Sequence, residues 1–464
     1  MRIAKAALMV AAASLAGCSL APPYSVPTSP AAPAYKELGP WQPAATRIQD
    51  PGKWWRLFGD PILSALEDRI EAGNPDLAAA VARYDAAKAA VRQARAQSLP
   101  SVDVGASAER DRVSAGRPLS ATGKPATFND LTVGPSLAFE IDLFGRVRNS
   151  IRASAEDARA SAQDLAGVRL GLQASLAGDY IQMRGLDARI TLLRQTVDAF
   201  QRAYDLTDTR HSGGIGSGVD VSRAASLLSS AKAELSSVAA DRAALEHAIA
   251  ILVGDSPSRF SLAVAEVQPA PPGIPVGVPS TLLERRPDIV AAENRIAAAN
   301  ARIGVARAAQ YPSLTLGGAG GFEAGNSNIL SAANGFWALG PLTAALSIFD
   351  GGARRAQVRI SRAQYDEAAA NYRSTVLNAF REVEDDLARA HYLSMQEADQ
   401  KAATSAAERT RDLSLIRYRD GAADYLEVVT AQTAALDAQR SLLQVETSRL
   451  QTAVDTVQAI GGLY

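Results

Sequence analysis

Cysteine, histidine and aromatic residues are scarce in this chain of 464 residues. Cys18 is the only cysteine, so the chain cannot form an internal disulfide, and the three histidines, His211, His247 and His391, are widely separated. No His or Cys cluster has the spacing of a metal site, and no glycine-rich loop is followed by the Lys and Ser or Thr of a phosphate-binding loop. We therefore expect no catalytic residue, no bound metal and no enzymatic activity.

Long apolar runs and an excess of one charge are also missing. Beyond the short run from Ala6 to Leu15, no segment offers about 18 uninterrupted apolar residues, the length that a transmembrane helix needs. A crossing of a bilayer would have to use β-strands, because only helices and closed barrels satisfy every backbone polar group in lipid. The formal net charge of −1 gives no electrostatic footprint for nucleic acid, and we expect no such partner.

The start of the chain resembles an export signal. Arg2 and Lys5 precede the apolar run, which leads into Leu15-Ala16-Gly17-Cys18. This ending is similar to a bacterial lipobox, which implies a lipoprotein signal peptide over 1–17 and a covalent lipid on Cys18 as the only cofactor. The alternative is a plain signal peptide with an unmodified cysteine at its end. Residues 19 to about 49 are rich in Pro, Ala and Ser, which indicates an extended tether, either wrapped on a surface or mobile.

The chain does have an internal duplication. The tetrapeptide Asn74-Pro75-Asp76-Leu77 returns as Arg286-Pro287-Asp288-Ile289, and each copy continues as an alanine-rich helical stretch that ends at a Pro-Ser pair. After each Pro-Ser pair come strand-like segments and then a proline-free helical tract. Roughly 60 helical residues reach on the order of 90 Å, a length that neighbouring helices normally stabilise. The duplication predicts a pseudo-symmetric shell of strands and long helices.

These patterns predict an α+β fold that is mainly α, with four strands per chain. In the first copy, 61–270, we expect helices at about 62–98, 148–209 and 220–253 and strands within about 101–142. In the second copy, 271–464, we expect helices at about 286–311, 353–419 and 425–460 and strands within about 313–349. Pro61, directly before the range 62–98, and Pro75, within it, lie at positions that helix first turns tolerate, which indicates two helices. The segments 113–130 and 323–335 are polar and are expected to be exposed loops.

The strand-like segments alternate apolar with polar or small residues, as Val102, Val104, Ala106 and Ala108 do. Four strands cannot close a barrel, and an open edge cannot lie in lipid because its amide groups would lack partners. Strands that span a membrane would therefore require an oligomer, and a trimer would supply about twelve strands. The alternative is two small soluble hairpins that cap a helical domain. The residue pattern alone leaves both readings open.

Two longer motifs carry a resemblance to a known family. One is Trp54-Trp55-Arg56-Leu57-Phe58-Gly59-Asp60-Pro61, and the other is the segment 279–289, which contains Arg285-Arg286-Pro287-Asp288. From Cys18 to Leu463 the chain resembles TolC/OprM-type outer-membrane efflux factors of the NodT subgroup. Beside this resemblance, Trp54 and Trp55 have a plain reading as packing anchors. The segment around Pro287 and Asp288 likewise reads as a helix start.

The resemblance implies a homotrimer with a 12-stranded β-barrel in the outer membrane, continuous with an α-helical barrel in the periplasm. Residues 18–60 would form the N-terminal tether and part of an equatorial segment. Such a channel is a passive exit duct for small molecules, lipid-anchored and barrel-inserted in a Gram-negative bacterium. An inner-membrane transporter of RND type drives it through a periplasmic adaptor. The alternative class is a periplasmic coiled-coil tether or adaptor lipoprotein without a pore.

The resemblance also places a periplasmic gate where each long tract reverses. The candidate gate residues are Tyr418, Asp424, Leu426, Glu427 and, in the first copy, Asp220. The candidate adaptor-contact residues at the tip are Gly214, Ile215, Gly421 and Ala422. A ring of Asp424 or Glu427 would gate by charge, whereas a Leu426 ring would gate by dewetting. The packing alternative is that Asp424 is a helix N-cap with Glu427 as its third-position partner.

Overall fold

The computed structural model describes residues 19–28, 34–37, 52–116, 124–265, 271–274 and 285–462. The predictions of a signal peptide over 1–17 and of a lipid on Cys18, and most of the tether prediction for 18–60, lie outside the described residues. The chain divides into two compact units. Unit 1 consists of Met1–Thr28, Arg83–Ala162 and Ala291–Tyr372, and unit 2 consists of Ser29–Ala82, Gln163–Val290 and Arg373–Tyr464. Each unit therefore combines segments from both sequence copies.

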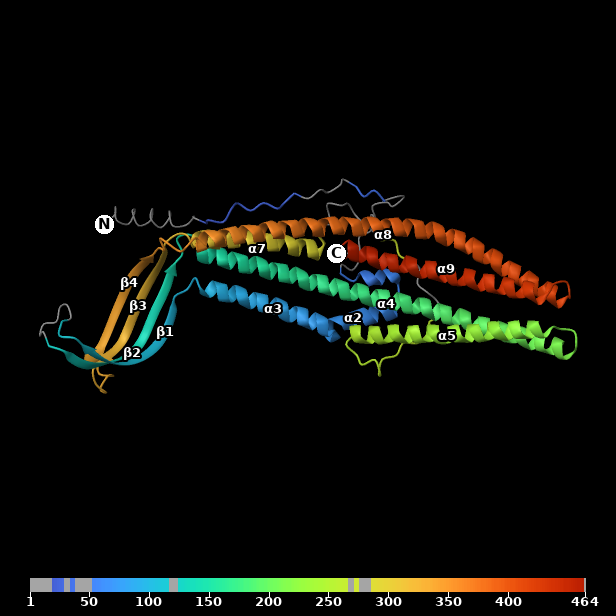
Figure 1. Ribbon diagram of the computed structural model, residues 1–464, viewed down its shortest axis with the longest axis horizontal. Coiled ribbons are helices and arrows are strands. Elements are labelled where there is room, and N and C mark those ends of the chain that lie inside the picture. The colour runs from blue at the N-terminus through green and yellow to red at the C-terminus, as the bar shows by residue number, and fades with distance from the viewer. Residues whose placement is uncertain are drawn as a thin grey trace. The chain divides into compact units, whose positions relative to one another are not determined.

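Helices make up most of the described chain (Figure 1). They are η1 (Trp54–Phe58), α2 (Pro61–Gly73), α3 (Pro75–Ala96), α4 (Arg146–Ser212), α5 (Gly218–Leu252), α7 (Pro287–Ala308), η2 (Ala332–Asn334), α8 (Ala353–Arg419) and α9 (Tyr425–Ala459). The range 62–98 is divided between two helices, α2 and α3, which begin at Pro61 and Pro75 as predicted. The Asp60 side chain caps α2 by accepting hydrogen bonds from the backbone N–H groups of Ile62 and Leu63. No helix of the described residues is both long and apolar enough to cross a membrane.

Four strands form one antiparallel sheet in the order β1-β2-β3-β4. The strands are β1 (Ser101–Val113), β2 (Ala126–Ile141), β3 (Ser313–Ala324) and β4 (Gly335–Ala345). Strands β2 and β3 come from different copies and pair with each other over Leu131 to Ile141 and Leu314 to Ala324. The two hairpins are therefore one sheet rather than separate caps.

The predicted loops 113–130 and 323–335 are too long. Strand β2 already begins at Ala126, and Asn129 and Thr127 pair with Arg110 and Arg112. Strand β3 continues to Ala324, where it pairs with Leu131. The polar side chains suggested a loop, but an antiparallel ladder is held by backbone hydrogen bonds that do not depend on side-chain polarity.

The strand register sorts the side chains onto two different faces, because directly paired residues share a face. One face is apolar and includes Val102, Val104, Ala106, Ala108, Leu131, Val133, Leu137, Phe139, Ile141, Leu314, Leu316, Phe322, Leu339 and Leu342. The other face is polar and includes Asp103, Ser107, Glu109, Asp130, Thr132, Ser136, Glu140, Thr315, Glu323 and Thr343. Residues from all four strands thus build one amphipathic sheet.

Glycine is required where β2 and β3 approach most closely. A Cβ atom on Gly134 would lie 2.0 Å from the carbonyl oxygen of Gly320, and one on Gly321 would lie 2.2 Å from that of Val133. Gly321 also has a positive φ of 148°, which L-residues rarely adopt. The glycine-rich run in β3 therefore serves the junction between the two copies.

The N-terminal segment of unit 1 lies against α7. The Arg307 guanidinium donates to the carbonyl of Leu20 at 3.2 Å, and the Asn300 amide donates to that of Pro22 at 2.9 Å. The Ser19 hydroxyl donates to the Asn149 side chain of α4 at 3.1 Å. The described part of the tether is thus wrapped on the helices.

The core of unit 2 includes both tryptophans of the N-terminal motif. Trp54 and Trp55 are buried with residues of α2, α4 and α9, so their reading as packing anchors is confirmed. The Tyr180 hydroxyl donates to the Asp60 carboxylate at 2.6 Å, which ties α4 to the cap of α2. Near the start of α7, the Arg286 guanidinium lies 2.7 Å from both Asp288 and Glu382 and donates to the Ala459 carbonyl.

A second polar cluster in unit 2 holds the chain that follows α5. Asp187 is fully buried, and its carboxylate accepts from Arg184 at 2.8 Å and from Arg242 at 2.7 Å. The same two arginines donate to the carbonyls of Ala263 and Leu262. One carboxylate therefore joins α4, α5 and the segment that follows α5.

Candidate functional site: the helical turns

The two long helices reverse in turns of the same construction. The turn between α4 and α5 has Gly214 at φ 75°, and the turn between α8 and α9 has Gly421 at φ 74°. In each turn the following residue donates its backbone N–H to a carbonyl five residues earlier, Ile215 to Arg210 at 2.9 Å and Ala422 to Arg417 at 2.8 Å. This pattern is the Schellman helix ending, in which glycine takes the left-handed position.

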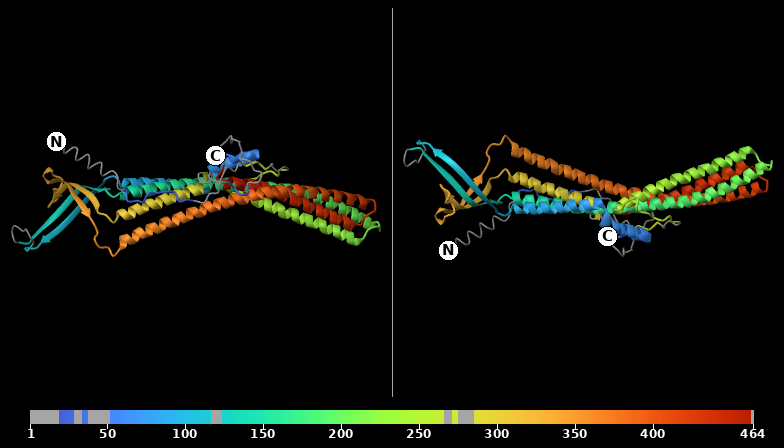
Figure 2. Two further views of the ribbon diagram at one scale, coloured as in Figure 1. Left: turned by 90° about the horizontal axis from the view of Figure 1, so that it is seen from above. Right: turned by 90° about the horizontal axis from the view of Figure 1, so that it is seen from below.

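Both turns lie at the same end of unit 2, where the α4–α5 and α8–α9 hairpins run side by side (Figures 1 and 2). All four predicted adaptor-contact residues, Gly214, Ile215, Gly421 and Ala422, are exposed there, and Ile215 is 77% exposed. An exposed isoleucine on a turn is available to a partner. Contact with an adaptor stays a prediction.

Tyr418 lies inside the structure beneath the turns rather than on its surface. It is buried in a cluster with Ala224, Tyr425 and Val428, and its ring centroid is 5.5 Å from that of Tyr425. The Arg210 guanidinium of α4 stacks 4.7 Å from the Tyr418 ring centroid and donates to the Tyr418 carbonyl at 3.3 Å. This contact joins the first copy to the second at the tip. The pKa of Tyr425 is raised to about 12, mainly by burial of its hydroxyl and further by the nearby Tyr418 and Asp220, whose negative charge would oppose its ionisation.

The acidic candidates at the start of α9 are both engaged within the chain. Asp424 is the N-cap of α9 and accepts from the backbone N–H of Glu427 at 2.9 Å, as the packing alternative predicts. The Glu427 carboxylate instead accepts from the Arg417 guanidinium at 2.6 Å and from the Ser414 hydroxyl at 3.5 Å. Arg417 also donates to the Ala422 carbonyl, so it ties the turn to both helices.

The remaining candidates differ in their surroundings. Leu426 is 48% exposed and lies beside Glu427 on the first turn of α9. Asp220, in the first turn of α5, lies 3.7 Å from Arg223. The start of α9 therefore presents the half-exposed Leu426 side chain beside the partly exposed Arg417–Glu427 ion pair.

Arg210, Arg417 and Tyr425 were not predicted as site residues. Yet Arg210 precedes Gly214 by four residues and Arg417 precedes Gly421 by four, so the duplication puts an arginine at the same place in each copy. That matched spacing was the available signal. It could not give the partners, because Arg210 contacts the other copy whereas Arg417 contacts its own.

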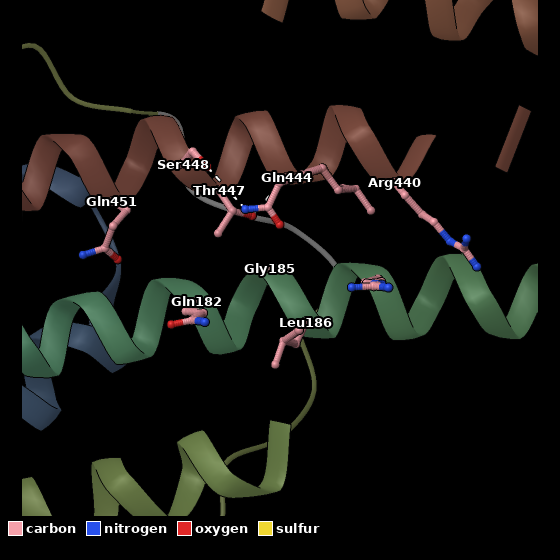
Figure 3. A pocket seen from close by; sticks show the side chains of 10 residues that line it. Gln182, Gly185, Leu186, Arg440, Gln444, Thr447, Ser448 and Gln451 are labelled. Carbon is pink, nitrogen blue, oxygen red and sulfur yellow. Dashed lines mark hydrogen bonds between the residues drawn. The ribbon is translucent and has the colours of Figure 1, made fainter. Parts of the chain in front are cut away.

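A polar groove lies between α4 and α9 in unit 2 (Figure 3). It has a volume of about 280 Å³, and amide and hydroxyl side chains such as Gln182, Gln444 and Thr447 line it. At one end, Glu234 of α5 bridges Arg189 at 2.7 Å and also pairs with Arg440. Glu234 thus neutralises part of the positive charge that the two arginines bring to the groove.

The comparison with known protein families matches the chain in two separate ranges, as the duplication does. The family described as "Outer membrane efflux protein" matches residues 66–255 and 278–462. The chain belongs to this family. The two matched ranges fall within the two copies of the sequence, one in each, and the family consists of channel proteins rather than enzymes.

Curated relatives and solved structures agree. Outer membrane protein OprJ of Pseudomonas aeruginosa is 32% identical over 98% of this chain and 95% of its own length. Probable efflux pump outer membrane protein TtgC of Pseudomonas putida is 33% identical over 98% and 94%. The outer-membrane channel OprN superposes with a TM-score of 0.89 at 30% identity, covering 96% of this chain and 99% of that one. The protein is an outer-membrane channel component of tripartite efflux systems.

Proposed function

We propose that three copies of this chain assemble into a passive exit duct, each sheet contributing four strands to a closed 12-stranded barrel. The sheet is the observation that carries this proposal. Within the described residues β1 and β4 each pair on one side only, which leaves two open edges. Open edges are not tolerated in lipid, and pairing β1 of one copy with β4 of the next removes all of them.

The apolar face has the height that a membrane demands. On β2 it extends from Leu131 to Ile141, ten residue steps apart. At about 3.4 Å per residue and a tilt near 45°, that distance corresponds to about 25 Å, the height of the apolar band on outer-membrane barrels. A soluble hairpin has no need of such a band.

The opposite face suits a water-filled bore. It carries the carboxylates of Asp103, Glu109, Asp130, Glu140 and Glu323, and the four strands place no lysine or arginine on that face. Groups of this charge stay hydrated, so the polar face belongs on the inside of the barrel.

In unit 2, the helical turns are the proposed gate. Three copies of the Arg417–Glu427 pair and of Leu426 would surround the axis, so that closure combines an ion pair with an apolar ring. The exposed turns at Ile215 and Ala422 are the proposed contact for a periplasmic adaptor, which connects the duct to an inner-membrane transporter of RND type.

A lipid on Cys18 fits the same arrangement. Ser19 and Leu20 are held by Asn149 and Arg307 at the end of α4 and α7 that adjoins the strands in sequence. The neighbouring Cys18 would place its acyl chains in the periplasmic leaflet of the outer membrane. We expect Cys18→Ala to abolish incorporation of labelled palmitate while the folded trimer stays in the membrane, because its strands would still span the bilayer.

The test of the duct is single-channel conductance in planar bilayers together with the mass of the purified assembly. A trimer that conducts supports the proposal. A protein that folds with the expected helix content but stays monomeric, or a trimer that never conducts, contradicts it and favours the alternative of a periplasmic tether without a pore.

A further inference from the structure

Two arginines interrupt the apolar face of the sheet at one end. Arg110 pairs with Asn129 and Arg112 with Thr127, so both lie on the same face as Val102, Val104, Ala106 and Ala108. They are the only lysine or arginine residues in the four strands. A charge on this face is costly in hydrocarbon, so its position along the strand carries information.

That position is directly beyond the apolar band. Ala108 pairs with Leu131, the last apolar residue of β2 on this face, and Arg110 and Arg112 follow one and two same-face steps later. If the band spans the hydrocarbon, then the two guanidinium groups lie at the level of the lipid headgroups. This step rests on the proposed function.

The end of the sheet also fixes the leaflet. Strand β1 follows α3 and strand β2 precedes α4, so the helices join the sheet at Ser101 and Ile141. Arg110 and Arg112 lie at the other end, next to the connection between β1 and β2. With the helices in the periplasm, that end faces the outer leaflet.

Neither arginine has a carboxylate to neutralise it among the residues that the structure describes. Both side chains are exposed, and the nearby acids Glu109 and Asp111 alternate onto the polar face. The two Cα positions are about 7 Å apart, two residues along a strand. One guanidinium group can donate two parallel hydrogen bonds to the oxygens of a phosphate. At this spacing, the two arginine side chains can bind the same phosphate or two adjacent phosphates.

We propose that Arg110 and Arg112 form a binding site for the phosphate groups of an anionic outer-leaflet lipid. Three such sites would surround the trimer just above its apolar band. They would fix the height of the barrel in the membrane and recruit phosphorylated glycolipid around it.

The experiment measures binding of lipid A to the purified full-length trimer in nanodiscs. The double variant Arg110→Gln/Arg112→Gln is compared with the native chain and with Arg83→Gln/Arg92→Gln, which removes the same charge from two exposed positions of α3. We expect at least tenfold weaker binding for the first variant and no change for the second. Arg110→Lys/Arg112→Lys keeps the charge and is expected to give an intermediate affinity.

Two further probes separate the sources of phosphate. We expect dephosphorylated lipid A to bind the native chain no more tightly than it binds the double glutamine variant. Inorganic phosphate that competes as well as lipid A at equal concentration would show a free-anion site and overturn the lipid assignment.

Equal binding of lipid A by native and double glutamine proteins would overturn the site itself. Conductance and assembly mass are recorded on the same samples. A conducting trimer without the lipid effect disproves only this inference, whereas a native protein that neither conducts nor forms a trimer disproves the proposed duct.

Discussion

The guanidinium of Arg417 lies 2.6 Å from the carboxylate of Glu427 and joins the last turn of α8 to the first turn of α9. The pair is partly exposed, which limits its free energy to about 1 kcal/mol or less. An interaction of that size can hold a gate closed and still be broken by a partner. The closed tip can therefore open at a small cost in free energy.

Replacing Glu427 with glutamine removes the ion pair and keeps the side-chain shape. We expect the open probability of single channels to rise, by up to about fivefold for each of the three pairs in the trimer, because about 1 kcal/mol corresponds to that ratio. Arg419→Ala is the matched control, since Arg419 is an exposed cation of the same helix end. An unchanged open probability in Glu427→Gln would remove this pair from the gate.

Replacing Gly134 with alanine should disrupt the junction between the two copies. The new Cβ would meet the Gly320 carbonyl at 2.0 Å, where backbone must shift. We expect loss of the assembled trimer on mild gel electrophoresis. Gly105→Ala is the control, because a Cβ at Gly105 in β1 meets nothing within 4 Å. Normal assembly of the Gly134 variant would refute the close approach.

Replacing Asp187 with asparagine should weaken unit 2 strongly. The change leaves the buried Arg184 without its counter-charge and leaves Arg242 with Glu246 alone, and breaking a buried pair typically costs about 3–5 kcal/mol. Thermal unfolding in detergent is the measurement. The control, Asp437→Asn, removes an exposed partner of Arg440 and is expected to change the midpoint little. Equal midpoints for the two variants would contradict the role of Asp187.

The stability of unit 2 should fall as pH rises toward neutrality, because of Asp386. Burial first, then the neighbouring Asp455, raises the pKa of Asp386 from 3.8 to about 7. The folded state therefore holds a proton between about pH 4 and pH 7 that the unfolded chain has lost, and stability declines across that window. Asp386→Asn should flatten the decline and be the more stable protein at pH 8, by about 1–3 kcal/mol. The control is Asp385→Asn, which changes the exposed neighbouring carboxylate. If Asp386→Asn keeps the pH profile of the native protein, Asp386 is not the cause of the decline.

The sequence predicted much of the secondary structure, because alternation, proline positions and the duplication are local signals. Strands β1 to β4 and the glycines Gly214 and Gly421 follow from such patterns. The pairing of β2 with β3 does not, since more than 170 residues separate Ile141 from Ser313 along the chain. The predicted loops are too long because polar residues such as Asn129 belong to the strand ladder.

The site shows the same division. The matched arginines Arg210 and Arg417 are visible in the sequence, but one stacks on Tyr418 and the other pairs with Glu427. Their partners depend on how the two hairpins lie together in space. The burial of Asp187 was likewise hidden, because a carboxylate on a helix looks the same in sequence whether water or arginine surrounds it.

The duplication has kept its dimensions. Helices α4 and α8 each contain 67 residues, and α5 and α9 each contain 35. A deletion of two turns from α4 alone would withdraw its hairpin by about 10 Å, at 1.5 Å per residue, and separate Arg210 from Tyr418. A duct of this kind can therefore lengthen or shorten only when both halves of its gene change together.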